Sequence, residues 1–286
     1  MQKSTYPLSN KSVLITGCSS GIGWTTAVYL AQHGFIVFAC VRKEKDREDL
    51  LRMAEPNLIP VCPLDLRRTE EIPTVMETVS AELQRRGQAG LYALINNAGG
   101  GGVAPVELMD VEIFHQELQT RLVGPVALVQ AFLPMLRQGG GRILWIATPA
   151  LIPSPFVASI HACDFAVNCL ARTLDIELKS WQIPNILIRC GGIKTARGMN
   201  TPAEKEPVLL HPRGELYRKS LGKWFDEMAE FDQKRTEPEK VAQVVLAALR
   251  APRPKRRYSV GYMSGPAAFL EGLPQSLTDK ILKMRF

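Results

Sequence analysis

The stretch TGCSSGIG at residues 16–23 decides the fold. It follows a β-branched run at residues 11–16 and opens a helical pattern at residues 22–33. Glycines at such a junction allow a tight turn and let the backbone approach a phosphate, while the helix N-terminus supplies unpaired N–H groups and a partial positive charge. The stretch therefore predicts a strand, a turn and a helix that bind a nucleotide, with a turn that holds no ligand as the alternative.

The rest of the chain alternates strand-like and helix-like segments. Apolar or β-branched runs predict further strands at residues 35–40, 58–64, 91–95, 142–146, 185–189 and 258–260. Helical patterns lie at residues 70–86, 111–137, 156–180 and 238–249. Strands separated by helices imply right-handed crossovers, so we expect an α/β fold: a single Rossmann-type, doubly wound domain over residues 1–286, with a mostly parallel sheet of about seven strands.

The alternation lapses between residues 195 and 236, where the sequence is polar and charged. A long irregular insertion after a strand is usually a lid or a binding loop, and we expect a lid or substrate loop here. Its mixed basic and apolar side chains suit an organic molecule with an anionic or polar end, and equally suit a lid exposed to water. These side chains are Arg213, Arg218, Lys219, Trp224 and Phe225.

The composition excludes several classes of protein. With 46% hydrophobic and 22% charged residues, the 286-residue chain is globular rather than disordered. Its six cysteines form no C-x-x-C pair and indicate reduced thiols of a cytoplasmic protein, without a metal site. The formal charge of +7 is densest at residues 253–257, which we interpret as a solvated loop because no aromatic residues alternate with the basic ones. We therefore expect no nucleic-acid partner, and no apolar run is long enough to span a membrane.

The chain resembles the short-chain dehydrogenase/reductase family. That family's T-G-x-x-x-G-I-G pattern is matched at every fixed position by residues 16–23, and its N-N-A-G pattern stands at residues 96–99. Asp65 matches the family's adenine-contacting aspartate after the third strand. The similarity continues to the R-Y-S-V-G ending at residues 257–261 and covers nearly the whole chain. The pattern is nearest to hydroxysteroid and retinol dehydrogenases.

The resemblance implies a nicotinamide dinucleotide cofactor. Arg42 and Lys43 stand where NAD-specific members carry an acidic residue for the ribose 2′-hydroxyl. Cations there pair with a 2′-phosphate, so we expect NADP(H), with a solvated loop charge as the alternative for Arg42. A later family pattern, P-G-x-I-x-T, reads CGGIKT at residues 190–195. The expected cofactor-binding residues are Gly17, Ser19, Ser20, Gly21, Ile22, Gly23, Arg42, Lys43, Asp65, Leu66, Asn97, Ala98, Gly99, Gly191, Ile193 and Thr195.

The resemblance also implies a catalytic Asn, Ser, Tyr and Lys, and here the sequence departs from the family. Arg121 stands at the Asn position and Thr148 at the Ser position, while Ile160 replaces the Tyr and Asp164 the Lys. The usual proton-transfer pair is therefore missing. We expect Arg121 and Asp164 to form an ion pair, the alternative being that both are solvated. The adjacent His161 is a candidate acid or base, unless the helix turns it away from the site.

The sequence supports three functional hypotheses. The leading one is an NADP(H)-binding protein repurposed for a non-redox cyclisation, isomerisation or rearrangement, in which Arg121 stabilises negative charge and Asp164 orients it or takes a proton. The second is an NADPH-dependent carbonyl reductase or alcohol dehydrogenase, with Thr148 and His161 or water serving the substrate oxygen. The third is a non-catalytic, cofactor-binding pseudoenzyme. The resemblance further implies a homodimer or homotetramer that pairs the helices at residues 111–137 and 156–180.

Overall fold

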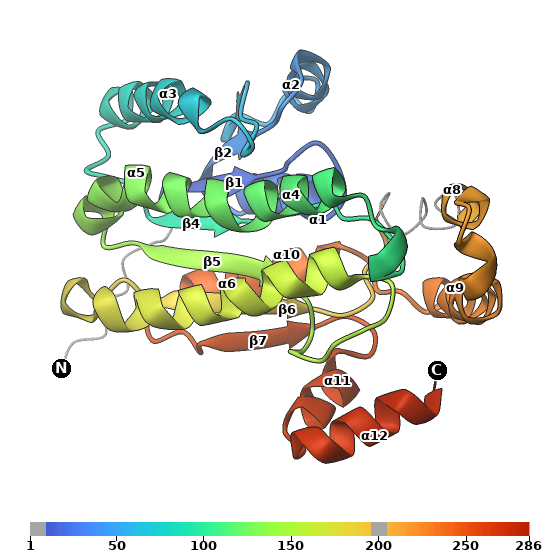
Figure 1. Ribbon diagram of the computed structural model, residues 1–286. Coiled ribbons are helices and arrows are strands. Elements are labelled where there is room, and N and C mark those ends of the chain that lie inside the picture. The colour runs from blue at the N-terminus through green and yellow to red at the C-terminus, as the bar shows by residue number, and fades with distance from the viewer. Residues whose placement is uncertain (1–9, 196–204, 286) are drawn as a thin grey trace.

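Seven parallel strands form the centre of the computed structural model, which describes residues 10–195 and 205–285. Every pair of neighbouring strands in this sheet is parallel, and the strand order reverses between β1 and β4. The predicted doubly wound α/β fold is confirmed (Figure 1). In sheet order the strands are β3 (Leu58–Val61), β2 (Ile36–Cys40), β1 (Ser12–Thr16), β4 (Ala93–Asn96), β5 (Arg142–Ala147), β6 (Asn185–Cys190) and β7 (Arg257–Val260).

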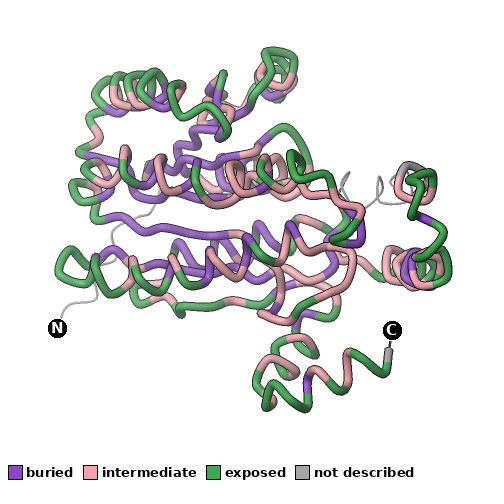
Figure 2. The backbone as a smooth tube through the Cα atoms, viewed as in Figure 1, coloured by how far each residue is buried: buried purple, intermediate pink, exposed green. Residues whose placement is uncertain are grey.

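Helices cover both faces of the sheet, which is why the five inner strands β2, β1, β4, β5 and β6 are almost wholly buried. Successive side chains of a strand point to opposite faces, so Val13 and Ile15 join the core on one side and Leu14 joins the core on the other. Figure 2 shows the buried strands between partly exposed helices. The first face is covered by α1 (Gly21–Gln32) and α10 (Glu239–Arg250), and the second by α3 (Ile72–Arg85), α5 (Gly124–Gly139) and α6 (Ala158–Glu177).

The helix expected at residues 111–137 is interrupted. It consists of α4 (Val111–Leu118), a π-helical turn η3 (Gln119–Val123) and α5. At the end of this turn Gly124 packs so closely that a Cβ atom would lie 2.3 Å from the carbonyl oxygen of Leu66. Such π turns often occur at functional sites, and this one carries Arg121.

The segment expected to be irregular, residues 195–236, is largely helical where the structure describes it. Residues 196–204 lie outside the described residues, and α8 (Lys205–Leu210), η6 (Gly214–Tyr217) and α9 (Arg218–Gln233) follow. The expectation of irregular structure is wrong because polar residues on the outer face of α9 hide an apolar inner face.

That inner face forms a small core of its own. Leu221, Trp224 and Phe225 are buried and pack with Val103 and Phe156. The rings of Trp224 and Phe156 meet edge to face, with centroids 6.0 Å apart. Trp224 and Phe225, two of the aromatic residues of the segment, are therefore not exposed to water.

The basic residues of the same segment lie at the surface. Arg213 contacts Glu107 at 2.7 Å and Arg218 contacts Glu215 at 2.6 Å, while Lys219 is exposed. The ion pair with Glu107 fastens this segment to the loop that precedes α4.

Besides α8 and α9, three further helices were not expected: α2 (Glu44–Leu51), α11 (Ser264–Glu271) and α12 (Gln275–Arg285). In Figure 1, α11 and α12 extend beyond β7, away from the helices of the second face. Arg189 of β6 is almost fully buried and forms an ion pair with Glu271 of α11. This pair fastens the last part of the chain to the sheet.

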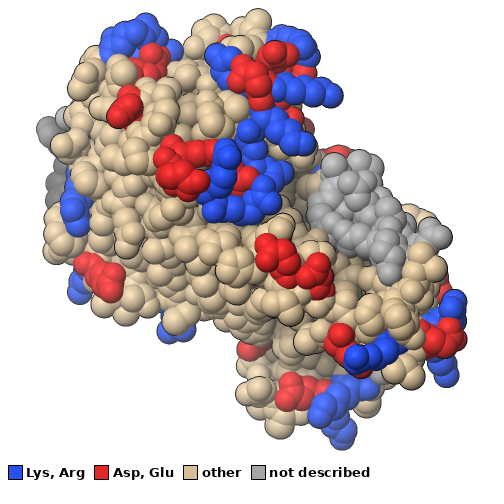
Figure 3. Space-filling model, turned by 45° about the horizontal axis from the view of Figure 1, so that its top comes forward, with Lys and Arg blue, Asp and Glu red and all other residues tan. Residues whose placement is uncertain are grey.

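The surface drawn in Figure 3 mixes the two signs of charge, so basic side chains form no continuous field on that face. No helix of the described residues is long and apolar enough to cross a membrane. Within the same residues, no group of three or more His, Cys, Asp or Glu side chains is arranged to hold a metal ion.

Candidate active site

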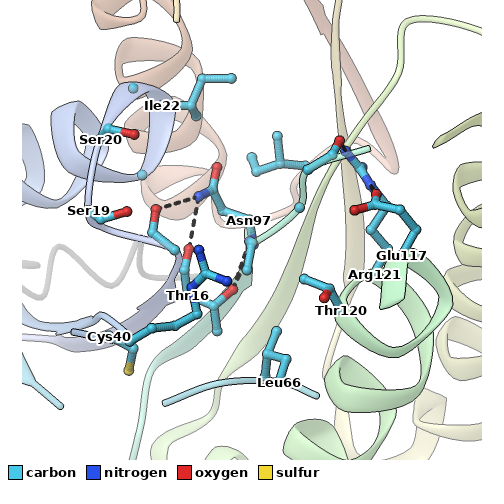
Figure 4. A pocket seen from close by; sticks show the side chains of 18 of the residues that line it. Thr16, Ser19, Ser20, Ile22, Cys40, Leu66, Asn97, Glu117, Thr120 and Arg121 are labelled. Carbon is cyan, nitrogen blue, oxygen red and sulfur yellow. Dashed lines mark hydrogen bonds and ion pairs between the residues drawn. The ribbon is translucent and has the colours of Figure 1, made fainter. Parts of the chain in front are cut away.

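A cavity of about 410 Å³ opens at the carboxyl ends of the strands, where the strand order reverses. Ligands of open α/β sheets bind at such a switch point. Figure 4 shows Ser19 and Ser20 on one wall and Glu117 and Arg121 on the opposite wall. The expected cofactor-binding residues that line the cavity are Gly17, Ser19, Ser20, Gly21, Ile22, Gly23, Arg42, Asp65, Leu66, Asn97, Ala98, Gly99 and Thr195.

The glycine turn depends on the absence of side chains. Gly17 and Gly21 adopt φ angles of 71° and 57°, in the left-handed region that favours glycine. A Cβ atom on Gly23 would lie 2.1 Å from the carbonyl oxygen of Gly17. The turn leads into α1, whose N-cap residue Ser20 makes no side-chain capping bond. The first N–H groups of α1 are therefore available to an anion.

Asn97 braces this turn from the end of β4. Its Nδ2 donates to the carbonyl oxygens of Thr16 at 2.8 Å and Gly17 at 3.2 Å (Figure 4). The backbone N–H groups of Asn97 and Ala98 both donate to Oγ1 of Thr16, each at 3.0 Å. These four bonds join the ends of β1 and β4 and fix the position of the turn.

Basic side chains gather at the end of the cavity beside β2 and β3. Arg42 and Arg67 both line it, and Arg67 contacts Asp65 through Nε at 2.9 Å and through Nη2 at 2.5 Å. The hydrogen bonds from Arg67 lower the pKa of Asp65 to about 2, and the charge of Arg42 acts in the same direction. Two guanidinium groups and one carboxylate leave this end with one excess positive charge, which suits a phosphate.

Three expected cofactor-binding residues lie outside the lining. Lys43 is the exposed N-cap residue of α2. Gly191 packs against Tyr262, whose carbonyl oxygen would lie 2.1 Å from a Cβ at this glycine. Ile193 is buried and bridges to Thr236. The last two residues support the end of β6 rather than face the cavity.

The remaining geometry fits a dinucleotide. The close approach of backbone at Gly17 and Gly23, the uncapped start of α1 and the basic end of the cavity are each suited to a phosphorylated ligand. Residues 19–23 would hold its phosphates, and Arg42 and Arg67 lie at the end suited to a further phosphate.

Arg121 is held on three sides at the opposite end of the cavity. Its Nε donates to Oε2 of Glu117 at 2.7 Å, Nη1 to Oδ1 of Asp164 at 3.2 Å, and Nη2 to the carbonyl oxygen of Gly100 at 2.8 Å. A Cβ atom on Gly99 would lie 2.7 Å from the Cζ atom of Arg121. The expected pair with Asp164 is thus present. Burial lowers the pKa of Arg121, but the charges of Asp164 and Glu117 outweigh this and raise it overall.

Asp164 uses both of its carboxylate oxygens. While Oδ1 accepts from Arg121, Oδ2 accepts from the backbone N–H of Thr148 at 2.8 Å. The Asp164 side chain is only 3% exposed. This carboxylate therefore ties α6 to the end of β5, and each of its oxygens already accepts one hydrogen bond.

Ile160 and His161, adjacent on α6, point in different directions. Ile160 lines the cavity and packs on Gly101, where a Cβ atom would lie 2.2 Å from its Cγ1. His161 does not line the cavity. Its Nδ1 lies 2.8 Å from the carbonyl oxygen of Ile152, a distance that requires the ring proton on Nδ1. Burial lowers the pKa of this histidine. His161 therefore packs behind the site.

Glu117 and Arg67 line the cavity but were not predicted from the sequence. Glu117 lies one helical turn before Arg121, and opposite charges at i and i+4 are a readable signal. Arg67 stands two residues after Asp65, in a loop where no periodicity marks a contact. Each of them pairs with a residue that the sequence did predict to be in the site: Glu117 with Arg121, and Arg67 with Asp65.

Comparison with known proteins agrees with this geometry. A family model described as short chain dehydrogenase matches residues 11–206. Human 17-beta-hydroxysteroid dehydrogenase type 1 is 32% identical over 256 residues, which cover 86% of this chain and 76% of that protein. Human 11-beta-hydroxysteroid dehydrogenase type 2 is 30% identical over 295 residues, which cover 98% of this chain and 71% of that protein.

Solved structures share the fold. A short-chain dehydrogenase from Streptomyces avermitilis gives a TM-score of 0.75 at 22% identity, covering 96% of this chain and 94% of that one. A short chain dehydrogenase from Burkholderia cenocepacia, in complex with NADP, gives a TM-score of 0.74 at 21% identity, covering 97% of this chain and 99% of that one. With the sheet order, the glycine turn and the family match, these findings lead to one conclusion. The chain belongs to the short-chain dehydrogenase family.

Proposed function

We propose that the chain is an NADP(H)-dependent oxidoreductase of a small organic substrate, a carbonyl reductase or alcohol dehydrogenase with an atypical proton donor. The observation that carries this proposal is the intact lining of the cofactor cavity, from the glycine turn and its Asn97 brace to the basic end at Arg42. A nicotinamide dinucleotide is the usual cofactor of the family, and the two human relatives are named as steroid dehydrogenases.

NADP(H) is favoured over NAD(H) by charge. Arg42 and Arg67 line one end of the cavity, and Arg67 alone is neutralised by Asp65. Arg42 therefore remains to bind the 2′-phosphate that distinguishes the two cofactors. Asp65 would face the adenine and Thr195 the nicotinamide, as the resemblance implies.

The reaction divides between cofactor and protein. The bound nicotinamide would supply or accept the hydride. The residues of this chain exclude water and orient the substrate: the Thr148 hydroxyl at the cavity wall is suited to a hydrogen bond with the substrate oxygen. Both oxygens of Asp164 are already hydrogen-bonded and its side chain is almost fully buried, while His161 lies outside the lining, so we assign neither the proton transfer.

A second candidate is the non-redox transformation expected from the catalytic substitutions. The observation that favours it is the Arg121–Asp164 ion pair inside the cavity, since a fixed guanidinium can stabilise developing negative charge. Against it, both carboxylates already neutralise Arg121, and each oxygen of Asp164 is already held in a hydrogen bond within the protein. A cofactor-binding protein without turnover is the third outcome that the experiment distinguishes.

Product mass analysis tests the proposal. The full chain is incubated with NADPH or NADP⁺ and a panel of ketones, aldehydes and alcohols that includes steroids. Products two hydrogens heavier with NADPH, or lighter with NADP⁺, are expected. Isomeric products would favour the second candidate. Tight NADPH binding without any product would favour the third.

We also propose a homodimer through α5 and α6. These helices lie side by side on one outer face of the molecule (Figure 1), and an apolar groove of about 520 Å³ runs between them. Leu133 and Leu170 line the groove, and Trp181 closes one end while 49% exposed. The same two helices are those that the resemblance pairs between subunits.

A cytoplasmic location is proposed from cysteine chemistry. All six cysteines are free thiols, five of which are buried or half-buried near the sheet core or the cavity: Cys18, Cys40, Cys62, Cys163 and Cys190. Free thiols persist in a reducing compartment.

A further inference from the structure

The two ends of the cavity carry opposite net charges. At the end beside β2, Arg42, Arg67 and Asp65 sum to one positive charge. At the opposite end, Arg121, Glu117 and Asp164 sum to one negative charge. Cys190, which also lines this second end, stays a neutral thiol because burial raises its pKa to about 12. The end at which a substrate would react therefore carries an excess negative charge.

Glu117 holds that excess charge. The residue is 7% exposed, yet it lines the cavity. Its Oε2 accepts from Arg121 at 2.7 Å, whereas Oε1 has no hydrogen-bond donor among the described residues. The free oxygen lies beside the Gly100 backbone, 3.1 Å from where a Cβ would stand. Because Glu117 Oε1 is not among the fully buried polar atoms without a partner, it is open to the cavity, where water or a ligand can satisfy it.

Glu117 also lies next to the surface where the usual proton donor would stand. Gly101 contacts both groups: its Cβ position is 2.2 Å from Ile160 Cγ1 and 3.3 Å from Glu117 Oε2. Ile160 supplies only hydrocarbon, so the site offers a carboxylate in place of a neutral acid. A ketone gains a proton on oxygen when it is reduced, and this end is poorly equipped to give one.

We propose that the substrate is a cation, an iminium ion reduced to an amine, with Glu117 as the group that binds its positive nitrogen. This assignment rests on the NADP(H)-dependent hydride transfer of the proposed function and replaces its carbonyl or alcohol substrate by an iminium ion. A carboxylate beside the nitrogen stabilises the iminium form, and the ammonium form of the product is bound in the same way.

The chemistry balances without a proton donor. Hydride from the reduced nicotinamide forms a C–H bond at the iminium carbon, and the π electron pair of the C=N bond moves to nitrogen. The substrate gains two electrons and loses its positive charge, and the nicotinamide is oxidised. No proton is consumed at this step, and the amine later takes one from water. The absence of the tyrosine and lysine is therefore tolerated by this substrate class.

The first test measures binding alone. Calorimetry on the full chain compares tetrahydroisoquinolinium, a cation at neutral pH, with isochroman, its neutral isostere with oxygen in place of the ring nitrogen. We expect the cation to bind about tenfold more tightly or better, as one charge-assisted hydrogen bond provides. Glu117→Gln, which keeps an acceptor for Arg121, should reduce this ratio to about one. The matched control is Glu112→Gln, an exposed residue on the same helix, which should leave the ratio unchanged.

The second test measures turnover with NADPH. N-methyl-dihydroisoquinolinium, a permanent cation, should be reduced at least tenfold faster than tetralone by the unaltered chain. If Glu117→Gln fails to fold, the binding ratio of the unaltered chain decides. A ratio of one, no measurable binding of the cation, or faster reduction of tetralone would overturn the proposal.

Titration with NADPH separates the two levels of inference. If NADPH does not bind, the proposed function fails, while the preference for the ammonium ion still reports on Glu117. If NADPH binds and reduces neutral carbonyls without any preference for cations, the proposed function stands and the iminium assignment fails.

Discussion

Arg121 and Asp164, 43 residues apart in sequence, form an ion pair with Nη1 and Oδ1 3.2 Å apart inside the cavity. The same guanidinium also contacts Glu117, so one buried cation serves two carboxylates. Removing the cation and removing one anion are consequently different perturbations.

Arg121→Gln should destabilise the chain more than Asp164→Asn. The first change leaves two buried carboxylates with no cation and should cost about 3–5 kcal/mol. The second leaves Arg121 paired with Glu117, and the new amide still accepts from Thr148, so about 1–3 kcal/mol is expected. Urea unfolding measures both, and the double variant should lose less than the sum. Arg47→Gln, in an exposed pair with Glu44, is the control. Additive losses would show that the pair is not coupled.

Arg42→Asp should weaken NADPH binding by at least about tenfold while NADH binding changes little, because only NADPH carries the 2′-phosphate. Fluorescence titration with both cofactors measures the difference. Lys43→Asp makes the same charge change at a residue outside the cavity lining and should cost less. Equal effects of Arg42→Asp on the two cofactors would contradict the assignment.

Gly23→Ala should abolish cofactor binding. The added Cβ would meet the Gly17 carbonyl oxygen at 2.1 Å, and backbone on both sides prevents an easy adjustment. Gly222→Ala in α9 is the matched control, because nothing lies within 4 Å of its Cβ position. There the change should stabilise the helix by about 0.5–1 kcal/mol. Equal cofactor affinity of the two variants would argue against the tight turn.

His161 should make stability depend on pH. Burial lowers its pKa in the folded chain below the ordinary value of 6.5, so below that pH the unfolded chain binds more protons. The free energy of unfolding should therefore fall as pH drops from about 7 to 5. His161→Asn keeps a donor for the Ile152 carbonyl and should flatten that slope. Parallel slopes for both chains would show that this histidine titrates normally.

Leu174→Glu should convert a dimer to a monomer, because it places a charge in the apolar groove between α5 and α6. Light scattering after size exclusion measures the mass. Leu51→Glu, at an exposed position on α2, should leave the mass unchanged. A monomeric unaltered chain would remove the basis for the dimer.

The fold was predictable because the five inner strands are buried on both faces and stand in the sequence as apolar runs, while the covering helices show a helical period. The glycine turn was equally predictable from sequence. Gly17 and Gly21 adopt positive φ angles, and Gly23 packs against the backbone of Gly17 only six residues before it. The prediction of irregular structure at residues 195–236 was wrong for a physical reason: α9 buries only a narrow apolar stripe around Trp224 among many charges. The polar composition of this segment concealed the helical spacing of its apolar residues.

The site was predictable only in part. Arg121 and Asp164 could be paired because the resemblance placed both in one pocket. The roles of their neighbours depend on three-dimensional detail: the π turn η3 sets the direction of Arg121, and one backbone N–H, that of Thr148, occupies the second oxygen of Asp164. No pattern of side chains in the sequence encodes either feature. The direction of His161 likewise follows from the position of Ile152.

The strand order also constrains how the chain is assembled as it is synthesised. β1 has β2 on one side, but its other edge waits for β4, and from there each new strand covers the edge left by the one before it, through β5 and β6 to β7. The growing sheet thus always has an open edge, and the longest interval falls on β1, which ends at residue 16 while β4 begins at residue 93. Until then β1 presents an apolar, hydrogen-bonding edge, the kind of surface on which incomplete chains aggregate.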